Sequence, residues 1–253
     1  MSFNFIVRKQ ISDYLHDYAH TQPQHEALIF DGQRLNYQKL SAQVDRCARA
    51  LLAVGINKGD RVAVLCTTRL EYWVTFLAVT QVGGIWLGLN PKYRLPEIRY
   101  VIEDAKPVLL FTIGHFEQQS YAPYIQSLQQ DYSFIQRVVA LTDPIDHCQR
   151  FADFLALADD ISPQQLADRQ QTIDAQDPAL LVYTSGSTGK PKGALLSHYG
   201  LCFGAAVQHQ HWRIERPRIT CSFPINHVAC VADTCCVNLV AGGTLLLQER
   251  FNA

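Results

Sequence analysis

Ten consecutive residues, Thr184–Gly193, concentrate the side chains that could bind an anion. They read TSGSTGKPKG and contain three glycines, four hydroxyls and two lysines. Glycines let successive backbone N–H groups point into one concavity, hydroxyls add short-range donors, and lysines add positive charge. Pro191 fixes its own φ and disfavours helix at Lys190, so the exit from the loop should be stiff. The composition predicts a cradle for a polyphosphate.

The loop differs from the common P-loop, G-x-x-x-x-G-K-[ST], which opens a helix. No glycine stands five positions before Gly189, and Pro191 takes the place of the required Ser or Thr. Apolar runs flank the loop on both sides, at Ala179–Tyr183 and Ala194–Leu196. We therefore predict a strand, a phosphate-binding loop and a second strand.

The stretch Leu181–Lys192 resembles the AMP-binding signature of the adenylate-forming superfamily, which includes acyl-CoA synthetases, luciferases and peptide-synthetase adenylation domains. Five further segments, in order along the chain, resemble landmarks of that family: Arg34–Tyr37, Gly59–Val64, Leu89–Arg94, Pro224–Val228 and Ala241–Thr244. The chain is most similar to the N-terminal part of an acyl-CoA synthetase. The Gly/Ser-rich surface loop that composition alone would allow is the weaker interpretation.

The resemblance implies an activity in which a carboxylate joins the α-phosphorus of ATP, pyrophosphate leaves, and the acyl group passes to the thiol of CoA. ATP, Mg²⁺ and CoA are the implied small molecules. A carboxylate with a pKa of about 4 to 5 is ionised at pH 7 and needs no general base. Catalysis should therefore consist mostly of positioning and charge neutralisation. A domain that loads a carrier protein and a non-catalytic nucleotide-binding remnant remain alternatives.

The resemblance also assigns roles to residues of the loop. Lys192 should be a cationic partner of the phosphates, whereas Lys190 could contact them or face solvent. Mg²⁺ should bridge phosphate oxygens. No catalytic residue and no metal ligand is assigned, because the family's lid lysine and magnesium-binding acid belong to parts absent from this chain. The residues expected to line the phosphates are Thr184, Ser185, Gly186, Ser187, Thr188 and Gly189.

His227 matches the family segment beside the acyl pocket, and a buried histidine satisfied by backbone groups is the alternative. Asn226 stands where many relatives have an aromatic residue. The nearest acid, Asp233, lies further along the chain, although a substrate ammonium would need a buried carboxylate partner. We therefore expect a fatty or other simple organic acid as the substrate.

The eight cysteines include no CxxC pair, and the opening residues do not form a secretory signal, so reduced thiols in a cytoplasmic protein are expected. A metal site is disfavoured because the spacing of its candidate ligands matches no common zinc pattern. Net charge is −1, which gives no reason to expect nucleic acid or an anionic membrane. The candidate ligands of the disfavoured metal site are His227, Cys230, Cys235 and Cys236.

Short apolar runs alternate with amphipathic helical segments, which predicts an α/β fold with doubly wound, largely parallel sheets. An Asp31-Gly32 turn should close a hairpin, and Asn36 should cap a long helix. Twenty uncharged residues between Glu71 and Lys92 resemble a membrane span in length, but their polar residues and Gly83-Gly84 favour a buried helix, turn and strand. The expected strands are Val62–Leu65, Ile85–Leu89, Val108–Thr112, Arg137–Leu141, Ala179–Tyr183 and Thr244–Leu247; the expected helices are Val7–Thr21, Tyr72–Val82, Pro96–Asp104, Tyr121–Gln130 and one within Ser162–Asp177.

The family resemblance divides the chain into a first α/β subdomain, 1–175, and a second segment, 176–253, that carries the phosphate loop and begins the next subdomain. The rest of the large domain and the C-terminal lid domain of the family are absent, so the fold is an incomplete N-terminal domain. We expect these 253 residues alone to lack turnover. We also expect them to form a homo-oligomer or to associate through the sheet edge that the missing half would cover.

Overall fold

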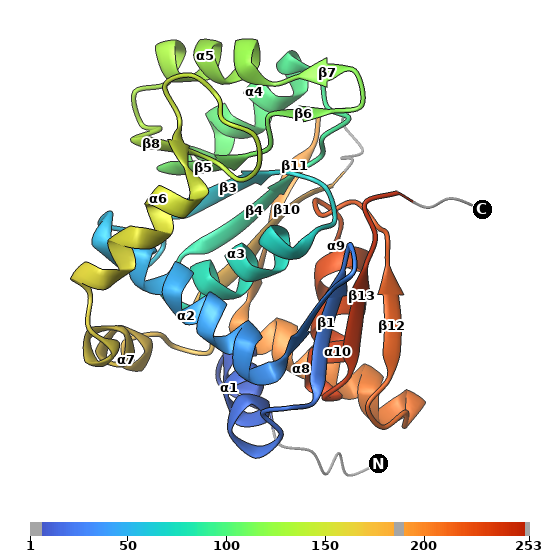
Figure 1. The fold of residues 1–253 in the computed structure, drawn as a ribbon. Coiled ribbons are helices and arrows are strands. Elements are labelled where there is room, and N and C mark those ends of the chain that lie inside the picture. Colours follow the sequence, from blue (N-terminus) through green and yellow to red (C-terminus); the bar gives the residue numbers. More distant parts are fainter. Residues whose placement is uncertain (1–6, 185–189, 251–253) are drawn as a thin grey trace.

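The computed structural model describes residues 7–184 and 190–250 of the chain. Their strands form a seven-stranded sheet, a four-stranded sheet and a two-stranded ribbon (Figure 1). The ribbon is made of β6 (His115–Phe116) and β7 (Gln119–Ser120). The predicted α/β class is confirmed.

The seven-stranded sheet has the order β11-β10-β4-β3-β5-β8-β9, and every neighbouring pair except β10 and β11 is parallel. The strands from β10 to β8 in this order are largely apolar runs, as expected where both faces of a sheet are covered, whereas the end strands β11 and β9 are polar or exposed. The bounds are β3 (Arg61–Leu65), β4 (Ile85–Leu89), β5 (Leu109–Thr112), β8 (Arg137–Ala140), β9 (Gln149–Arg150), β10 (Pro178–Thr184) and β11 (Lys192–Ser197). The predicted strands of this sheet are confirmed to within two residues at either end.

Helices cover both faces of this sheet, with α2, α3 and α6 on one side and α4 and α5 on the other (Figure 1). This is the doubly wound arrangement that the alternating pattern predicted. The helices of this part are α1 (Ile11–Thr21), α2 (Tyr37–Ala53), α3 (Leu70–Gln81), α4 (Leu95–Ala105), α5 (Ala122–Asp131), α6 (Phe151–Ala156) and α7 (Pro163–Gln171), with a 3₁₀ turn at Leu157–Asp160.

The four-stranded sheet joins segments from the two ends of the described chain. Its order is β12-β13-β1-β2, and Leu28 of β1 lies beside Leu245 of β13 in parallel register. The predicted hairpin is confirmed, and its turn residues Asp31 and Gly32 have φ of 45° and 76°, as a two-residue hairpin turn requires. The strands are β1 (Glu26–Phe30), β2 (Gln33–Asn36), β12 (Arg218–Cys221) and β13 (Thr244–Leu247).

Helix α2 begins where the sequence predicted. The side chain of Asn36 accepts a hydrogen bond of 2.8 Å from the backbone N–H of Lys39, which satisfies one of the free donors of the first turn. Four residues of the predicted stripe are fully or almost fully buried, and they pack the helix against the sheet: Leu40, Val44, Cys47 and Leu51.

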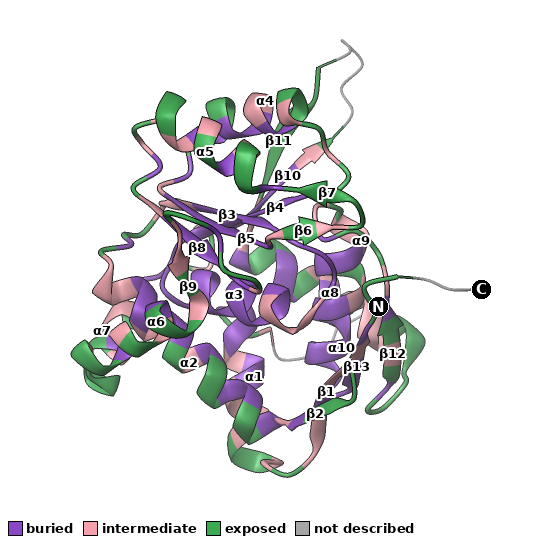
Figure 2. Ribbon diagram, turned by 45° about the horizontal axis from the view of Figure 1, so that its top comes forward, coloured by how far each residue is buried: buried purple, intermediate pink, exposed green. Residues whose placement is uncertain are grey.

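The uncharged stretch after Glu71 is core, as predicted. It forms α3, a turn at Gly83 with φ of 79°, and β4. Trp73, Phe76 and Trp86 are buried there and their rings contact one another. Figure 2 shows α3 and the neighbouring strands as the buried layer. Within residues 7–184 and 190–250, no helix has the length and apolar character needed to cross a membrane.

The second half of the chain adds helical segments that the sequence pattern did not predict. They are α8 (His198–Trp212), α9 (Val228–Cys230), a π-helical turn (Val231–Cys236) and α10 (Val237–Val240). Each of the two large sheets contains strands from both sides of residue 175. The division into 1–175 and 176–253 therefore stays a prediction from the family resemblance, and the sheets do not follow it.

Candidate functional site

The predicted phosphate loop connects two paired strands. In the antiparallel β10–β11 hairpin, Thr184 lies opposite Lys192 and Tyr183 opposite Gly193. The Thr184 hydroxyl is 3.5 Å from the Lys192 carbonyl oxygen, and both residues are exposed. The strand–loop–strand architecture is thereby confirmed, and Thr184 and Lys192 stand together at the mouth of the loop. The other predicted loop residues, Ser185, Gly186, Ser187, Thr188 and Gly189, lie outside the described residues.

The two lysines of the motif both face solvent in the structure. Lys192 begins β11, whereas Lys190 belongs to the bend before it. Position on a strand restricts the backbone of Lys192 more than that of Lys190. The geometry therefore leaves the phosphate role of each lysine as a prediction, and it makes Lys192 the better positioned of the two.

Helix α4 holds the hairpin from the side. The Tyr100 hydroxyl donates a 2.8 Å hydrogen bond to the carbonyl oxygen of Pro191, and the Tyr183 hydroxyl donates to the carboxylate of Asp104. Burial, together with the hydrogen bond to Asp104, raises the pKa of Tyr183. Tyr100 and Asp104 were not predicted as site residues. Their four-residue spacing on one helical face was a signal, but only the fold shows that this face meets the hairpin.

The hairpin ends at the edge of the sheet where the parallel strands also end. Ligands of open α/β sheets bind in the crevice outside the carboxyl ends of strands. A hollow of about 580 Å³ lies at this edge, between the loops that follow β3, β4, β12 and β13. Its polar lining comes mainly from the following side chains: Thr67, Thr68, Asn90, Lys92, Ser222, Glu249 and Arg250.

Hydrogen bonds tie the two sheets together at this hollow. The Thr67 hydroxyl donates to the Glu249 carboxylate over 2.6 Å, and the Thr68 hydroxyl donates to the carbonyl oxygen of Phe223 over 2.5 Å. Arg69 forms an ion pair with the same Glu249 at 3.2 Å. The loop after β3 thus fixes the positions of the segments that follow β12 and β13.

His227 lies on the segment after β12, as its place in the family pattern predicted, but it is exposed and not buried. It caps α9, and its Nδ1 accepts a 3.1 Å hydrogen bond from the backbone N–H of Ala229. Because Nδ1 is an acceptor, the neutral ring carries its proton on Nε2. His227 therefore presents an N–H donor on the ring nitrogen that the cap leaves unused.

The residues before His227 are fixed by the first sheet. The Asn226 amide donates a 3.1 Å hydrogen bond to the Tyr93 hydroxyl. A Cβ on Gly88 would lie 2.7 Å from the carbonyl oxygen of Ile225, so only glycine allows this approach of β4 to the segment. Tyr93 and Gly88 were not predicted as site residues. Tyr93 belongs to a landmark segment of the sequence and Gly88 to a predicted strand, but their contacts with Asn226 and Ile225 come from the fold.

The acid nearest to this segment is already engaged. Asp233 accepts a 3.2 Å hydrogen bond from the Gln208 amide of α8. Its carboxylate is exposed. The class of the acid substrate stays a prediction.

The cysteines considered as metal ligands from sequence are grouped differently in the structure. The sulfur atoms of Cys221, Cys230 and Cys235 lie within 4.8 Å of one another, and all three residues are buried. His227 and Cys236 do not belong to this group. All eight cysteines are free thiols, as expected. Residue spacing did not indicate this grouping, in which the fold brings Cys221 of β12 to Cys230 and Cys235.

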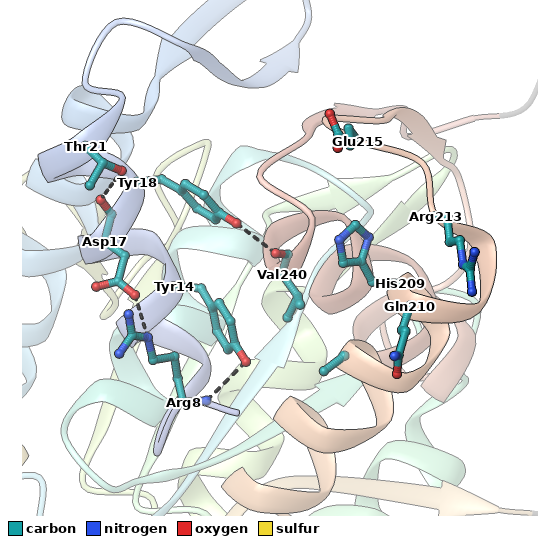
Figure 3. Close-up of a pocket in the computed structure, with 11 residues that line it drawn as sticks. Arg8, Tyr14, Asp17, Tyr18, Thr21, His209, Gln210, Arg213, Glu215 and Val240 are labelled. Atoms are coloured by element: carbon teal, nitrogen blue, oxygen red, sulfur yellow. Dashed lines mark hydrogen bonds and ion pairs between the residues drawn. The ribbon is translucent and has the colours of Figure 1, made fainter. Parts of the chain in front are cut away.

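A second hollow, of about 780 Å³, lies between α1 and the end of α8 (Figure 3). Its polar side chains interact with neighbours across and along its wall. Arg8 pairs with Asp17 at 2.7 Å, and the Tyr18 hydroxyl donates to the carbonyl oxygen of Val240 at 2.8 Å. The Tyr18 hydrogen bond connects α1 with α10, whereas the Arg8–Asp17 pair connects α1 with the residues just before it. They do not converge on a common point that would select a ligand.

The strand–loop–strand hairpin at the carboxyl edge of a doubly wound sheet defines the class of the domain, an open α/β fold of the kind that binds ligands outside the carboxyl ends of its strands. The profile of the AMP-binding enzyme family matches residues 15–253, and the chain belongs to this family. This confirms the resemblance on which the site prediction rests.

Named relatives point in the same direction. The chain is 28% identical to the mitochondrial medium-chain acyl-CoA ligase of Macaca fascicularis, covering 97% of this chain and 43% of that protein. It is 30% identical to an indoleacetate–CoA ligase of Aromatoleum aromaticum and 31% identical to a feruloyl-CoA synthase of Amycolatopsis, covering 96% and 92% of this chain. It spans 46% and 43% of those two proteins, so it corresponds to less than half of each relative.

Solved structures support the fold. A long-chain-fatty-acid CoA ligase structure from Rhodopseudomonas palustris superposes with a TM-score of 0.83 at 24% identity, covering 96% of this chain and 58% of that one. MatB from the same organism has a TM-score of 0.74 at 26% identity, covering 96% of this chain and 46% of that one. The comparisons confirm the incomplete N-terminal domain of an adenylate-forming enzyme.

Proposed function

We propose that the β10–β11 loop binds the phosphates of ATP and that the complete protein activates a carboxylic acid. A carboxylate oxygen attacks the α-phosphorus, the bond to pyrophosphate breaks, and an acyl adenylate forms. A thiol, that of CoA, then displaces AMP and gives the thioester. The observation that carries this proposal is the paired hairpin with Thr184 and Lys192 at its mouth in a member of the AMP-binding enzyme family.

Each part of the loop has a defined task in this proposal. Backbone N–H groups at Gly186 and Gly189 and hydroxyls at Thr184, Ser185, Ser187 and Thr188 donate to phosphate oxygens. Lys192 neutralises the charge that develops on the leaving pyrophosphate, which is the largest contribution expected from a preorganised site. The contacts of α4 with Tyr183 and Pro191 hold the two ends of the loop, so that less order has to be created when ATP binds.

Magnesium would bridge phosphate oxygens, as it does in other enzymes that bind polyphosphates. The chemistry of the described hairpin fits phosphate better than it fits the metal, because its side chains are hydroxyls and lysines. The carboxylate beside it, Asp104, accepts the Tyr183 hydroxyl. We therefore assign no residue of this chain as a magnesium ligand.

We propose that the acid substrate is apolar, a fatty or aryl acid. His227 presents an Nε2–H donor that suits a carboxylate, and Asn226 is held by Tyr93. Asp233, the nearest acid along the chain, accepts a hydrogen bond from Gln208, so a substrate ammonium would lack a partner there. The names of the relatives, which specify medium-chain acyl, indoleacetate and feruloyl groups, support an apolar acid and CoA as the acceptor.

Pyrophosphate exchange into ATP by the complete protein, as its gene encodes it, tests the function. We expect exchange that depends on fatty or aryl acids and on Mg²⁺ and that is lost on replacing Lys192. Exchange that responds to amino acids alone would reject the substrate class. A protein that binds ATP but exchanges with no acid would support the non-catalytic remnant, and product formation on a carrier protein with none on CoA would support the carrier-loading alternative.

We propose the cytoplasm as the compartment and self-association of the isolated 253 residues. Eight free cysteines suit a reducing environment. Strand β11 lies at an end of its sheet, and Leu195, Tyr199 and Phe203 of β11 and α8 are more than a third exposed. Exposed edges with apolar side chains favour pairing with another chain. Cell fractionation of the complete protein and sedimentation of the isolated residues test these two points.

A further inference from the structure

Three thiols converge behind the segment that carries His227. Cys221 ends β12, Cys230 ends α9, and Cys235 belongs to the π-helical turn. The sulfurs of Cys221 and Cys230 are 3.5 Å apart, and all three sulfurs lie within 4.8 Å of one another. Each of the three residues has no exposed surface.

The π-helical turn is what brings two of these thiols together. In an α-helix, residues five apart point about 140° away from each other, because each residue turns the helix by about 100°. Cys230 and Cys235 are five apart, and the helix changes to the i→i+5 hydrogen-bonding pattern between them. Residues five apart share a face in that pattern. The local irregularity and the thiol cluster therefore coincide, and π-turns of this kind occur frequently at functional sites.

A fourth donor stands next to the thiols. The Tyr72 hydroxyl of α3 lies 3.3 Å from the Cys235 sulfur and 3.5 Å from the Cys230 sulfur. Tyr72 is fully buried. The cluster therefore contains three sulfurs and one oxygen, supplied by three separate parts of the fold: β12, α3, and the continuous α9–π-turn segment.

Three of the separations between these atoms are close to those between the corners of a zinc tetrahedron, and the other sulfur pairs lie within 4.8 Å. With Zn–S bonds of about 2.3 Å, two sulfur ligands lie about 3.8 Å apart, and with a Zn–O bond of about 2.0 Å a sulfur and an oxygen lie about 3.5 Å apart. The measured separations of 3.5 Å for two sulfurs and of 3.3 Å and 3.5 Å for oxygen and sulfur are within about 0.3 Å of these values. Small movements of side chains would suffice to close the site.

We propose that Cys221, Cys230 and Cys235, with the Tyr72 hydroxyl at the fourth corner, form a structural site for a divalent thiophilic ion of the zinc class. On binding, three S–H bonds break, three Zn–S bonds form and three protons leave to solvent, and nothing is oxidised. Three thiolates and one divalent ion carry a net charge of −1. A monovalent ion would leave −2 in the same buried volume, which is the less favourable charge to bury.

The ion would close a loop around the proposed acid-binding segment. Residues 222–229 run from Cys221 to Cys230, and they include Asn226 and His227. Binding both ends to one ion would fix the end of β12 relative to α9 and so limit the positions available to His227. The site is independent of the phosphate loop, so the ion can bind whether or not the protein activates acids.

The test is the zinc content of the complete protein, purified in the presence of a thiol reductant, equilibrated with Zn²⁺ and dialysed. We expect one zinc per chain at this site. The X-ray absorption spectrum of the bound zinc should show three sulfur neighbours at about 2.3 Å and one oxygen neighbour. Replacing Cys221 or Cys230 with Ala should weaken zinc binding more than 100-fold, beyond the about 10–100-fold usual for residues that only support a ligand. Tyr72→Phe should weaken it by about tenfold or more and leave three sulfurs.

Cys236→Ala is the matched control, because Cys236 is equally buried on the same helical segment but does not belong to the cluster. It should keep the zinc of the unaltered protein. Should a cysteine variant fail to fold, the absorption spectrum of the unaltered protein still decides the ligand set. Absence of bound zinc in the unaltered protein, equal zinc loss in the control, or recovery of a Cys221–Cys230 disulfide in its place would each overturn the proposal.

Discussion

The β10–β11 hairpin and the segment that follows β12 are held in different ways. The hairpin after β10 is exposed, and it is fixed at its two ends by strand pairing and by Tyr100 and Asp104 of α4. The segment after β12 is fixed along its length, by the close approach of Gly88, by Tyr93 and by the buried thiols.

The difference follows from what each loop has to do in the proposed reaction. A phosphate loop gains its contacts from the ligand, so it needs support only at its ends. A segment that lines an acid pocket must keep its shape when empty, and buried contacts provide that shape. Replacements in the hairpin should therefore change activity more than stability, and those around the second segment should do the reverse.

The largest expected effect is that of Lys192→Ala. Pyrophosphate exchange by the complete protein should fall about 100-fold or more, because the charge that neutralises the leaving group is removed. Stability should change by less than about 0.5 kcal/mol, since Lys192 is exposed. Lys190→Ala is the matched control and should keep most of the activity. Equal losses for the two lysines would place both on the phosphates.

The residue that follows β11, His198, is buried, and a pH titration tests its effect on stability. His198, which follows β11 and begins α8, has no hydrogen-bond partner on either ring nitrogen among the described residues, and burial lowers its pKa to about 4. The unfolded chain, with a histidine pKa near 6.5, binds the proton more readily between these values. Stability should therefore fall by up to about 3 kcal/mol as the pH drops from 6.5 to 4.

Urea denaturation at several pH values measures this slope. His198→Gln should flatten it, whereas the same change at the exposed His227 should leave it unaltered. A slope that persists in His198→Gln would assign the acid sensitivity to other groups.

Gly88→Ala tests the segment after β12. The added Cβ would lie 2.7 Å from the Ile225 carbonyl oxygen and 2.7 Å from the Trp86 ring, so we expect a loss of about 1–3 kcal/mol in urea denaturation. Gly204→Ala in α8 is the control, because its Cβ would meet nothing within 4 Å and alanine favours helix. A neutral Gly88→Ala would show that the segment moves freely against β4.

The smallest expected effect is that of Tyr100→Phe, which removes the hydrogen bond to Pro191. Loss of this hydrogen bond should weaken ATP binding by about 0.5–1.5 kcal/mol. The KM for ATP should therefore rise by a few fold, with kcat little changed. Tyr124→Phe, whose hydroxyl donates to Gln119 away from the hairpin, is the control. An unchanged KM would mean that strand pairing alone orders the loop.

Many elements of the fold could be predicted because they depend on short stretches of the sequence. The strands at 62–65 and 85–89 are short apolar runs, and the turn at Asp31-Gly32 and the cap at Asn36 depend on the conformations of single residues. Such segments have few alternative structures, because strands buried on both faces must be apolar and buried backbone groups must be hydrogen-bonded. Helix α8 was missed because its glycines, histidines and exposed aromatic residues weaken a helical pattern.

The candidate site divides in the same way. The phosphate loop is a prediction from ten adjacent residues, because glycine conformation, hydroxyl reach and lysine charge act over a few bonds. The place of His227 on the segment beside the acyl pocket could be expected only from the family resemblance. Tyr100, Asp104, Gly88 and Tyr93 gained their roles through contacts between segments that are distant in sequence.

The sequence by itself determined the parallel α/β class, the strand–loop–strand form of the phosphate site and the family, since each depends on short patterns of burial, turn formation and charge. Only the tertiary structure decided that β1 pairs with β13, that α4 supports the loop, and that Cys221 rather than Cys236 joins Cys230 and Cys235. The first two outcomes depend on contacts between segments that are far apart in sequence. The third depends on a single π-helical turn, which rotates side chains by an amount that residue spacing does not reveal.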